Sequence, residues 1–477
     1  MYQDVQLLID GQWGPASDGR TIDVLNPASG EVIGTVAHAG RAELEQVVAA
    51  AARGFEALSA MSSFERAALL RRAGALCAAR VDRIAELITL EQGKPLAEAR
   101  IEAAQIAEHC NWMAGECERI QGHVIPARFA FVQQKVIRDP VGPVALFTPW
   151  NFPTGQLVRK VASAIAAGCS IVAKAPEETP ASCAEMVRAF EEAGLPAGAL
   201  NLVYGAPAEI SEFLIAHPVI RKISFTGSTA VGKHLAELAG RHMKRTTMEL
   251  GGHGPVIVFD DADLEVAVAR IAAAKFRNAG QVCTSPTRFS VQASRYEEFV
   301  DRFVAAAQAV TVGDGMDPAS QMGPLANIRR VQAMEGFVAD AVRRGARLRT
   351  GGKRIGNRGN FFEPTILTDV PLDARVMNEE PFGPLALVQP FETMDDAVAE
   401  ANRLDYGLAA YAFTTSSPKA TEFTRRVESG MVSINHFGCG LAETPLIGMK
   451  DSGYGYESGS EGIEAYLQAR FVTVADL

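Results

Sequence analysis

The feature that most constrains the fold is an alternation, between residues 141 and 249, of short apolar runs with longer amphipathic segments. Apolar runs of this length predict buried strands, and amphipathic segments between them predict the crossover helices of a parallel sheet. The strand candidates are residues 144–148, 170–173, 200–204, 222–225 and 246–250. The helix candidates are residues 156–167, 179–194, 208–215 and 230–239. The pattern is typical of a doubly wound α/β sheet of the nucleotide-binding type.

The rest of the chain predicts further helices and a second unit. Residues 41–118 are rich in Ala, Leu, Arg and Glu and predict several helices, with breaks near 62–63 and 93–95. Residues 255–391 alternate again and predict another α/β unit. Its helices are expected at 264–276 and 294–309, and its strands at 289–292 and 382–389.

The C-terminal residues 466–474 form a β-prone apolar run. In a monomer such a run would form an exposed, association-prone strand edge. Pairing with another subunit and pairing within the chain's own sheet explain the run equally well.

Composition and charge exclude several classes of protein. The net charge of -10 argues against a general electrostatic hold on nucleic acid or on an anionic membrane. The chain has no basic stretch followed by an apolar one at its start and no run of 18 apolar residues, so we expect neither secretion nor membrane spanning. Seven cysteines without a Cys-x-x-Cys pair, and eight histidines without ligand spacing, predict reduced thiols in a cytoplasmic protein and no metal.

Residues 227–233 come close to a phosphate-binding P-loop and make a nucleoside triphosphatase a rival hypothesis. A P-loop needs a Ser or Thr hydroxyl for Mg²⁺ at the next position, which is His234. The glycine turn and helix N-terminus still suit the pyrophosphate of a dinucleotide. Taken alone, a plain strand-to-helix turn explains the two glycines better.

Six motifs decide between these readings. They are Thr148-Pro149-Trp150-Asn151-Phe152-Pro153, Lys174-Ala175-Pro176-Glu177, Phe225-Thr226-Gly227-Ser228-Thr229, Glu249-Leu250-Gly251-Gly252, Gly280-Gln281-Val282-Cys283 and Glu380-Pro381-Phe382-Gly383-Pro384. With these six motifs in this order, the chain resembles the NAD(P)-dependent aldehyde dehydrogenase superfamily along essentially its whole length. Around the site it is most similar to α-ketoglutarate semialdehyde and succinate semialdehyde dehydrogenases.

The resemblance implies an aldehyde dehydrogenase-like α/β fold of two interleaved Rossmann-type domains with a small β oligomerisation element. The NAD-binding domain is expected at residues 1–121 and 141–251, and the catalytic domain at residues 252–458. The oligomerisation element is expected at residues 122–140 and 459–477. It implies a homodimer or a homotetramer.

The resemblance also assigns three catalytic residues. Cys283 matches the nucleophile, and a thiolate suits the task because it adds readily to an aldehyde and leaves later, which splits the oxidation into two easier steps. Asn151 matches the residue whose amide, with the nucleophile's backbone N–H, stabilises the oxyanion. Glu249 matches the general base that activates water to hydrolyse the thioester, which favours a free acid over acyl transfer to coenzyme A. Without the resemblance, a buried hydrophobe, a helix cap and a surface glutamate would explain these residues.

The cofactor residues follow in the same way. Lys174 and Glu177 match the pair that holds the adenosine ribose. A carboxylate at Glu177 accepts hydrogen bonds from a free 2′-OH and repels a 2′-phosphate, so we expect NAD rather than NADP. A favourable place at the positive end of the following helix is the alternative explanation of Glu177. The remaining matches to cofactor contacts are Thr148, Trp150, Gly227, Ser228, Leu250, Glu380 and Phe382.

Two arginines narrow the substrate. Arg159 and Arg277 lie near Asn151 and Cys283 in the sequence and suit an aldehyde with a remote carboxylate, which Arg binds bidentately. Both match arginines of succinate semialdehyde dehydrogenases, although either could pair with a structural carboxylate instead. Gly440 stands where those enzymes have a substrate-binding serine, and leaves room for the longer α-ketoglutarate semialdehyde. Ser285 stands where some members have a second thiol, so no switch disulfide of that type can form.

We therefore expect an NAD-dependent enzyme that oxidises a carboxylate-bearing semialdehyde, α-ketoglutarate semialdehyde or similar, to the dicarboxylic acid. It would act through a thiohemiacetal and a thioester on Cys283. The alternatives are a succinate semialdehyde dehydrogenase and a broad-specificity or aromatic aldehyde dehydrogenase. From another class, a catalytically inactive dinucleotide-binding protein is the remote alternative.

Overall fold

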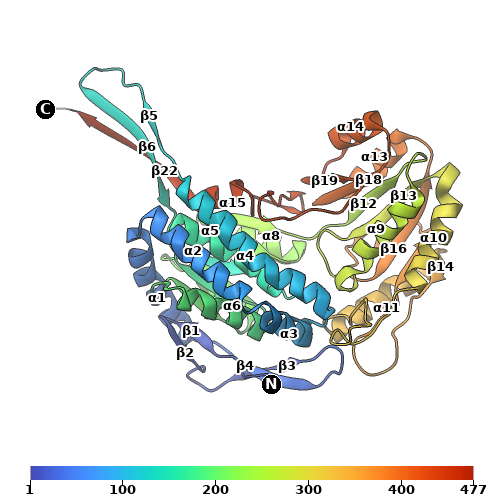
Figure 1. Ribbon diagram of the computed structural model, residues 1–477, viewed down its shortest axis with the longest axis horizontal. Helices are drawn as coiled ribbons and strands as arrows, with labels where there is room; N and C mark the ends of the chain where they lie inside the picture. The colour runs from blue at the N-terminus through green and yellow to red at the C-terminus, as the bar shows by residue number, and fades with distance from the viewer. Residues whose placement is uncertain (1, 476–477) are drawn as a thin grey trace.

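The computed structural model describes residues 2–475. Residues 1, 476 and 477, which belong to the ends of the predicted NAD-binding and oligomerisation segments, lie outside the described residues. Two large sheets, each with helices packed against it, form the body of the molecule, and a narrow three-stranded sheet projects from it (Figure 1).

The first large sheet has the order β2-β1-β9-β8-β7-β10-β11-β21. Its parallel strands are β7 (Val144–Phe147), β8 (Ile171–Lys174), β9 (Leu200–Val203), β10 (Lys222–Thr226) and β11 (Arg245–Glu249). The crossover helices are α5 (Pro153–Ala167), α6 (Pro180–Glu192), α7 (Pro207–Ala216) and α8 (Thr229–Arg241). The winding reverses between β7 and β10, and in such sheets ligands bind outside the carboxyl ends of the strands at the reversal.

The predicted strands and helices of this sheet are confirmed, with end shifts of up to about three residues, which is the ordinary uncertainty of helix and strand boundaries. The largest shift is at α5, which begins at Pro153 rather than at residue 156. Proline fixes a helical φ and lacks an N–H that the first turn leaves unpaired, so it starts a helix well. Antiparallel strands close the sheet: β1 (Leu7–Ile9) and β2 (Gln12–Gly14) at one end, and β21 (Gly453–Tyr454) at the other.

The second large sheet has the order β14-β15-β16-β13-β12-β18-β19 and confirms the second α/β unit. Its strands are β12 (Gly254–Val258), β13 (Pro286–Gln292), β14 (Arg347–Thr350), β15 (Thr365–Thr368), β16 (Leu385–Phe391), β18 (Ala409–Phe413) and β19 (Met431–Ile434). Its helices are α9 (Leu264–Phe276), α10 (Tyr296–Gln308), α11 (Ile328–Arg343), α12 (Arg375–Asn378), α13 (Met394–Asn402) and α14 (Ser417–Arg426). The strand expected from residue 382 begins only at Leu385, because Phe382 has a left-handed φ of 44° and Pro384 has no N–H for the ladder.

Four helices precede β7: α1 (Arg41–Ala60), α2 (Ser63–Ala78), α3 (Val81–Gln92) and α4 (Leu96–Glu118). The two predicted breaks are confirmed, and a third, at residues 79–80, has neither Gly nor Pro to mark it. The smaller elements are the strands β3 (Thr21–Leu25), β4 (Val32–Ala37), β17 (Tyr406–Gly407) and β20 (Met449–Lys450), the helix α15 (Glu461–Glu464), and single 3₁₀ turns at Arg277–Gly280 and Ala293–Arg295.

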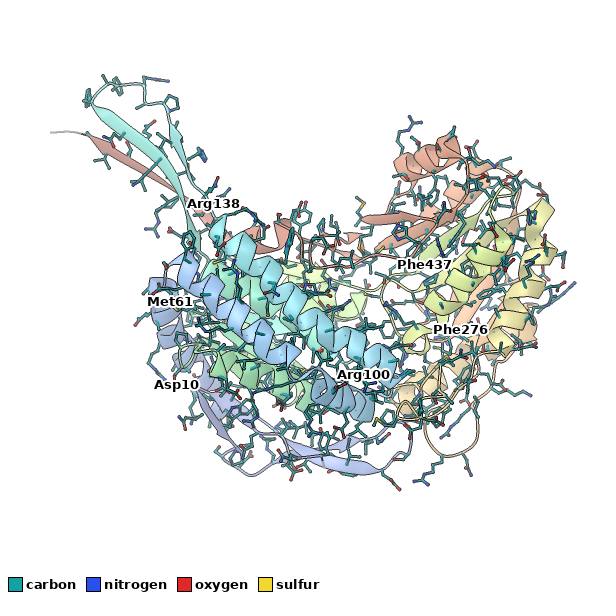
Figure 2. The ribbon with its side chains drawn as sticks, in the orientation of Figure 1. Asp10, Met61, Arg100, Arg138, Phe276 and Phe437 are labelled. Atoms are coloured by element: carbon teal, nitrogen blue, oxygen red, sulfur yellow. The ribbon has the colours of Figure 1, made fainter. Side chains whose placement is uncertain are left out.

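The projecting sheet, here called the arm, consists of β5 (His123–Ile125), β6 (Val132–Pro140) and β22 (Leu467–Ala475). β22 pairs with β6 along its whole length, so the C-terminal run pairs within its own chain. Its other edge is open in the described chain, and Figure 2 shows the arm standing clear of the body with side chains on both faces. Pairing of that edge with another subunit stays a prediction.

Candidate active site

A cavity of about 550 Å³ opens where β7, β10 and β11 end, at the reversal of the first sheet. It gathers residues from five of the six motifs. The predicted site residues that line it are Trp150, Asn151, Gly227, Ser228, Leu250, Cys283, Glu380 and Phe382. We call it the cofactor cavity.

The turn before Cys283 has an unusual backbone. Asn278, Ala279 and Gly280 all have left-handed φ values, of 49°, 52° and 72°. A Cβ on Gly280 would overlap the Gly383 carbonyl oxygen, so only glycine fits there. The turn thereby brings the loop of residues 280–285, here called the cysteine loop, directly against the segment that follows Glu380.

Burial, together with the nearby Glu380 and Glu249 carboxylates, raises the pKa of the Cys283 thiol to about 12, against the opposing effect of Arg159. The thiol is therefore protonated at neutral pH in this state. It becomes a nucleophile only after a base takes its proton.

Asn151 follows β7 and lies against the cysteine loop. Its side-chain amide Nδ2 donates to the Gln281 carbonyl oxygen at 3.1 Å. An amide has two N–H groups, so a second one is available to a ligand. In the described part of the chain the backbone N–H of Cys283 has no acceptor either. Asn151 and Cys283 thus line the same cavity, and each has an N–H without an acceptor in the described chain, as an oxyanion site requires.

Glu249 ends β11 and is only 2% exposed. Neither carboxylate oxygen has a hydrogen-bond partner among the described residues. Burial raises the pKa of Glu249 well above 4.5 and Glu457 raises it further, while Lys160 and Arg159 lower it. A carboxyl group with a raised pKa and no fixed partner is suited to accept a proton. Glu249 does not itself line the cofactor cavity.

A buried cluster behind Glu249 contains a residue that the sequence did not suggest. Lys160 Nζ forms an ion pair with Glu457 and donates to Ser224 Oγ at 3.0 Å. The Ser224 hydroxyl donates in turn to Glu457 Oε1 at 3.0 Å. Glu457 lies 297 positions after Lys160, in a stretch of Gly and Ser without any pattern, so no sequence signal identifies it.

The cofactor cavity has the features that a dinucleotide needs. Thr229 and Ala230 line it from the first turn of α8, where unpaired backbone N–H groups favour a phosphate. Lys233, the P-loop-like lysine, forms an ion pair with Asp451 instead. The rings of Trp150 and Phe382 meet edge to face, with centroids 5.7 Å apart, and present aromatic surface to the cavity.

Glu380 is fixed at the opposite wall of this cavity. Its Oε1 accepts a hydrogen bond from the Gly252 N–H at 3.0 Å, and a Cβ on Gly251 would come within 2.6 Å of its Oε2. Burial raises the pKa of Glu380 to about 7, against the effects of that backbone N–H, Arg330 and Lys275. The glycines of the segment after Glu249 thus make room for the Glu380 carboxylate.

The predicted ribose pair lies at the next strand end. Lys174 Nζ and Glu177 Oε1 are 2.6 Å apart, and the same oxygen accepts the Gly205 N–H at 3.2 Å. Thr148 lies beside them, its N–H donating to the Lys174 carbonyl oxygen at 3.3 Å. None of these three predicted residues lines the cofactor cavity as the structure has it.

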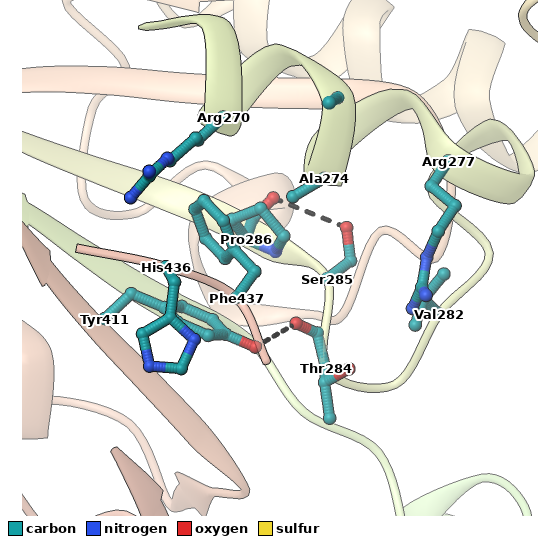
Figure 3. Close-up of a pocket in the computed structure, with 11 residues that line it drawn as sticks. Arg270, Ala274, Arg277, Val282, Thr284, Ser285, Pro286, Tyr411, His436 and Phe437 are labelled. Carbon is teal, nitrogen blue, oxygen red and sulfur yellow. Dashed lines mark hydrogen bonds between the residues drawn. The ribbon is translucent and has the colours of Figure 1, made fainter. Parts of the chain in front are cut away.

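A second cavity, of about 420 Å³, adjoins the cysteine loop, and Figure 3 shows the residues that line it. Val282 and Thr284 line it, whereas Cys283 between them lines the cofactor cavity. The predicted nucleophile therefore belongs to the cofactor cavity, and its two chain neighbours belong to the second cavity. Tyr411 donates to the Thr284 carbonyl oxygen at 2.6 Å and packs on Phe437 at 4.5 Å between ring centroids, which gives the second cavity an aromatic wall.

The structure separates the two predicted substrate arginines. Arg277 is exposed in the second cavity, 5.4 Å from the Phe152 ring centroid, and forms no hydrogen bond or ion pair with the described residues (Figure 3). Arg159 is buried and lines neither cavity; it donates to the Gly440 carbonyl oxygen at 2.5 Å and to Ser458 Oγ at 3.1 Å. Sequence reasoning missed two further nitrogen-bearing side chains of the second cavity, Arg270 and His436.

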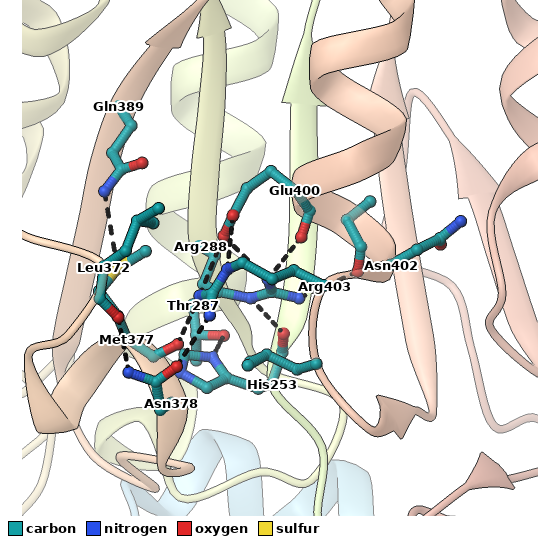
Figure 4. A network of polar contacts seen from close by, with 12 residues as sticks. His253, Thr287, Arg288, Leu372, Met377, Asn378, Gln389, Glu400, Asn402 and Arg403 are labelled. Atoms are coloured by element: carbon teal, nitrogen blue, oxygen red, sulfur yellow. Dashed lines mark hydrogen bonds and ion pairs between the residues drawn. The ribbon is translucent and has the colours of Figure 1, made fainter.

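A polar network supports the loops from the second sheet (Figure 4). His253, just after the Glu249 segment, contacts Thr287 Oγ1 at 2.7 Å and the Val376 carbonyl oxygen at 3.0 Å through its two ring nitrogens. Arg288 donates to the His253 carbonyl oxygen at 3.0 Å. The network thus connects three segments next to predicted site residues: the residues after Glu249, the residues after Cys283 and the residues before Glu380.

No group of three or more His, Cys, Asp or Glu side chains within residues 2–475 is placed to hold a metal ion. In the same residues no helix is both long and apolar enough to span a bilayer.

Comparisons with known proteins identify the family of the chain. The model of the aldehyde dehydrogenase family matches residues 13–472. A 4-(hydroxymethyl)benzenesulfonate dehydrogenase of Comamonas testosteroni is 48% identical over 99% of this chain and 98% of its own. The NADP⁺ succinate-semialdehyde dehydrogenase of Escherichia coli is 41% identical over 98% and 97%. The crystal structure of succinate-semialdehyde dehydrogenase from Burkholderia pseudomallei superposes with a TM-score of 0.97 at 41% identity, over 99% and 98% of the two chains. The chain belongs to the aldehyde dehydrogenase family and is an oxidoreductase.

Proposed function

We propose that the protein is an NAD-dependent dehydrogenase of aldehydes with a remote anionic group, α-ketoglutarate semialdehyde or a similar semialdehyde, and that it releases the dicarboxylic acid. One observation carries the proposal: Cys283 lines the cofactor cavity, and its chain neighbours Val282 and Thr284 line a second cavity that also contains Arg277, whose guanidinium has no ion-pair partner in the described chain. An anionic aldehyde whose far end binds Arg277 would bring its carbonyl toward the thiol.

The chemistry follows from the groups around Cys283. The Cys283 thiol loses its proton to solvent water, its Sγ adds to the aldehyde carbon as the C=O π bond breaks, and the oxygen becomes an oxyanion beside Asn151 and the Cys283 N–H. NAD, when bound, supplies the acceptor for the hydride that leaves this carbon. A water that loses its proton to Glu249 then attacks the thioester, a C–O bond replaces the C–S bond, and Cys283 leaves as a thiolate.

Replacing the nucleophile tests the mechanism. We expect Cys283→Ala to form no NADH above background from any aldehyde, while its affinity for NAD, measured by quenching of protein fluorescence, stays within about twofold of the wild type. Turnover that survives in Cys283→Ala would refute the proposal. A protein that binds NAD but forms no NADH with any aldehyde even as wild type would be the inactive dinucleotide-binding protein.

NAD preference is the second part of the proposal. The Glu177 carboxylate is held by Lys174 and Gly205. We propose that it accepts a hydrogen bond from a ribose 2′-OH and repels a 2′-phosphate. We expect kcat/KM for NAD to exceed kcat/KM for NADP about tenfold or more. We expect Glu177→Gln to lower this ratio. The name of the Escherichia coli relative specifies NADP, so a preference for NADP is the outcome that would overturn this part.

A second candidate substrate is an aromatic aldehyde that carries an anionic group. The aromatic wall of Tyr411 and Phe437 in the cavity with Arg277 favours it, since flat rings pack well on aromatic faces. The name of the Comamonas relative also gives an aromatic sulfonate as what that enzyme acts on.

A panel of aldehydes distinguishes the candidates. We would measure kcat/KM for α-ketoglutarate, succinate and glutarate semialdehydes, for 4-formylbenzenesulfonate and for uncharged benzaldehyde. The proposal expects an aliphatic semialdehyde to lead by about tenfold, or 1.4 kcal/mol. A lead of that size for the sulfonate would establish the second candidate, and a lead for benzaldehyde would refute both.

The domain division and the compartment belong to the same proposal. Of three apolar cores in the described residues, one contains residues between Val5 and Leu250 and between Ile463 and Leu467, and the other two contain residues between Val256 and Leu446. This division supports a cofactor domain and a catalytic domain with nearly the expected boundaries. All seven cysteines are free thiols, which supports a reducing, cytoplasmic location.

A further inference from the structure

The loop between α3 and α4 lies buried beneath the active site, and Lys94 is its centre. Lys94 is 1% exposed, and its ammonium donates to Glu102 Oε2 at 2.6 Å and to the Asn151 carbonyl oxygen at 2.7 Å. The Phe152 ring centroid lies 3.8 Å from Nζ on a third side. A buried lysine therefore holds the peptide group of the predicted oxyanion residue.

Glu102 holds the same segment one step further along the chain. Its Oε1 accepts hydrogen bonds from the Thr154 N–H at 3.0 Å, the Thr154 hydroxyl at 3.1 Å and the Gly155 N–H at 3.1 Å. These groups form the first turn of α5, whose preceding residue, Phe152, supplies no side-chain cap. Glu102 thus caps the helix that follows Asn151 from a neighbouring helix, α4.

The same loop also holds the cysteine turn. The Gln92 amide donates to Asn278 Oδ1 at 2.8 Å and accepts the Lys94 backbone N–H at 3.0 Å. Asn278 Nδ2 donates to the Asn151 carbonyl oxygen at 3.0 Å and to the Gln281 carbonyl oxygen at 3.2 Å. The Asn151 carbonyl is therefore the common acceptor of Lys94 and Asn278, and it joins elements of the two α/β units.

We propose that Gln92, Lys94, Glu102 and Asn278 form a brace that positions the Asn151 side chain against the Cys283 loop. One N–H of the Asn151 amide is then occupied by the Gln281 carbonyl, and the brace aims the other at the oxyanion. A preorganised donor is effective because it needs no reorganisation during the reaction, and a misplacement of about 1 Å can cost about 100-fold in rate. The four residues are positioning residues, and the inference rests on the oxyanion role proposed for Asn151.

The test is a double-mutant cycle with Asn151. We expect Asn151→Ala to lower kcat about 100- to 1000-fold and Lys94→Met, which keeps the side-chain length, to lower it about 10- to 100-fold. In the Asn151→Ala background, Lys94→Met should change kcat by less than about threefold, because the residue that it positions is already gone. KM for NAD should stay within about twofold of the wild type throughout. Gln92→Leu, which removes no charge, provides the same cycle if Lys94→Met does not fold.

The chain offers a matched control for the charge at a helix start. Glu91 is also buried and accepts the Ala181 N–H at 2.6 Å and the Ser182 N–H at 3.1 Å, in the first turn of α6. Glu91→Gln and Glu102→Gln thus make the same substitution at two buried carboxyl groups that each accept hydrogen bonds from the first turn of a neighbouring helix. We expect kcat at saturating NAD to fall about tenfold in Glu102→Gln and less than about twofold in Glu91→Gln.

The outcomes separate this inference from the proposed function. If Asn151→Ala keeps full activity, the oxyanion role fails and the brace fails with it. If Asn151→Ala is slow but the Lys94→Met or Gln92→Leu effect persists in full in the Asn151→Ala background, only the brace is refuted. Equal losses in Glu91→Gln and Glu102→Gln would also refute the brace, because they would show a general loss of helix stability.

Discussion

The Glu249 carboxyl group has both a raised pKa and two oxygens without partners in the described chain. It acts as a base only when it is deprotonated, and its pKa lies well above 4.5 because the group is buried beside Glu457. Turnover should therefore be lost, as the pH falls, at a higher pH than an ordinary glutamate would dictate. Steady-state kcat against pH at saturating substrates measures this; an acid limb at or below pH 4.5 would contradict it.

Replacing Glu249 separates the two halves of the reaction. In Glu249→Gln we expect a burst of about one NADH per subunit, because the thioester still forms, followed by turnover about 100-fold or more below the wild type. Hydroxylamine, which attacks a thioester without a general base, should restore turnover. Rapid mixing with and without hydroxylamine measures both effects. Absence of the burst would mean that Glu249 is needed before the thioester forms.

The two arginines should differ in what they recognise. Arg277 is exposed in the second cavity and has no ion-pair partner among residues 2–475. Arg277→Ala should therefore raise KM for an anionic semialdehyde about 10- to 100-fold and leave KM for benzaldehyde nearly unchanged. Arg277→Lys keeps the charge but loses the bidentate geometry, so its KM for the anionic semialdehyde should lie between those of the wild type and Arg277→Ala. Arg159 holds Gly440 and Ser458, so Arg159→Ala should slow all aldehydes alike and lower Tm. A selective effect of Arg159→Ala on anionic aldehydes would instead make it a substrate residue.

At the scale of elements, the network of Figure 4 makes His253 a support for the cofactor cavity. Its ring nitrogens contact Thr287 and Val376, four residues before Glu380. Burial, with Arg288 nearby, holds the pKa of His253 well below 6.5, so the ring is neutral. His253→Leu should raise KM for NAD about tenfold, because it removes both contacts and loosens the Glu380 segment. The rate of Cys283 alkylation by iodoacetamide should not change.

Asn402→Leu is the matched control for His253→Leu. Asn402 also makes two hydrogen bonds in this region, to the Arg426 carbonyl and from the Glu428 N–H, but none to the segment before Glu380. We expect it to lower Tm without raising KM for NAD. Equal effects of the two substitutions on KM would show that the network merely stabilises the fold.

The elements were largely predictable because their signals are local. Apolar runs, Pro at first helical positions and Gly168 after α5 mark the first sheet within a few residues of each boundary. The site was predictable only where motifs carry it. The Lys160–Glu457 pair joins positions 297 apart, and the break between α2 and α3 has no special residue. Contacts of these kinds arise from tertiary packing, which no local pattern records.

At the scale of the whole molecule, the arm is the part that a single chain leaves incomplete. Its exposed apolar residues are Val124 (81%), Phe129 (57%), Phe131 (58%), Phe471 (56%) and Val474 (53%). Single exposed apolar residues are ordinary, but a group of them on a projecting sheet with a free edge is the pattern that we expect of a subunit interface. The homodimer or homotetramer predicted from the sequence would bury this surface.

The last prediction tests that interface. We expect the wild-type protein to sediment as a dimer or tetramer, and Phe471→Asp to shift it toward smaller species, because a buried charge without a partner costs several kcal/mol at an interface. Leu372→Asp, at a position 54% exposed in the second α/β unit, introduces the same charge away from the arm and should leave the assembly unchanged. Sedimentation velocity at several concentrations measures the assembly state of the wild type and of both variants. Since both cavities are lined within one chain, dissociated Phe471→Asp should keep much of its kcat; its complete loss would show that assembly also shapes the site.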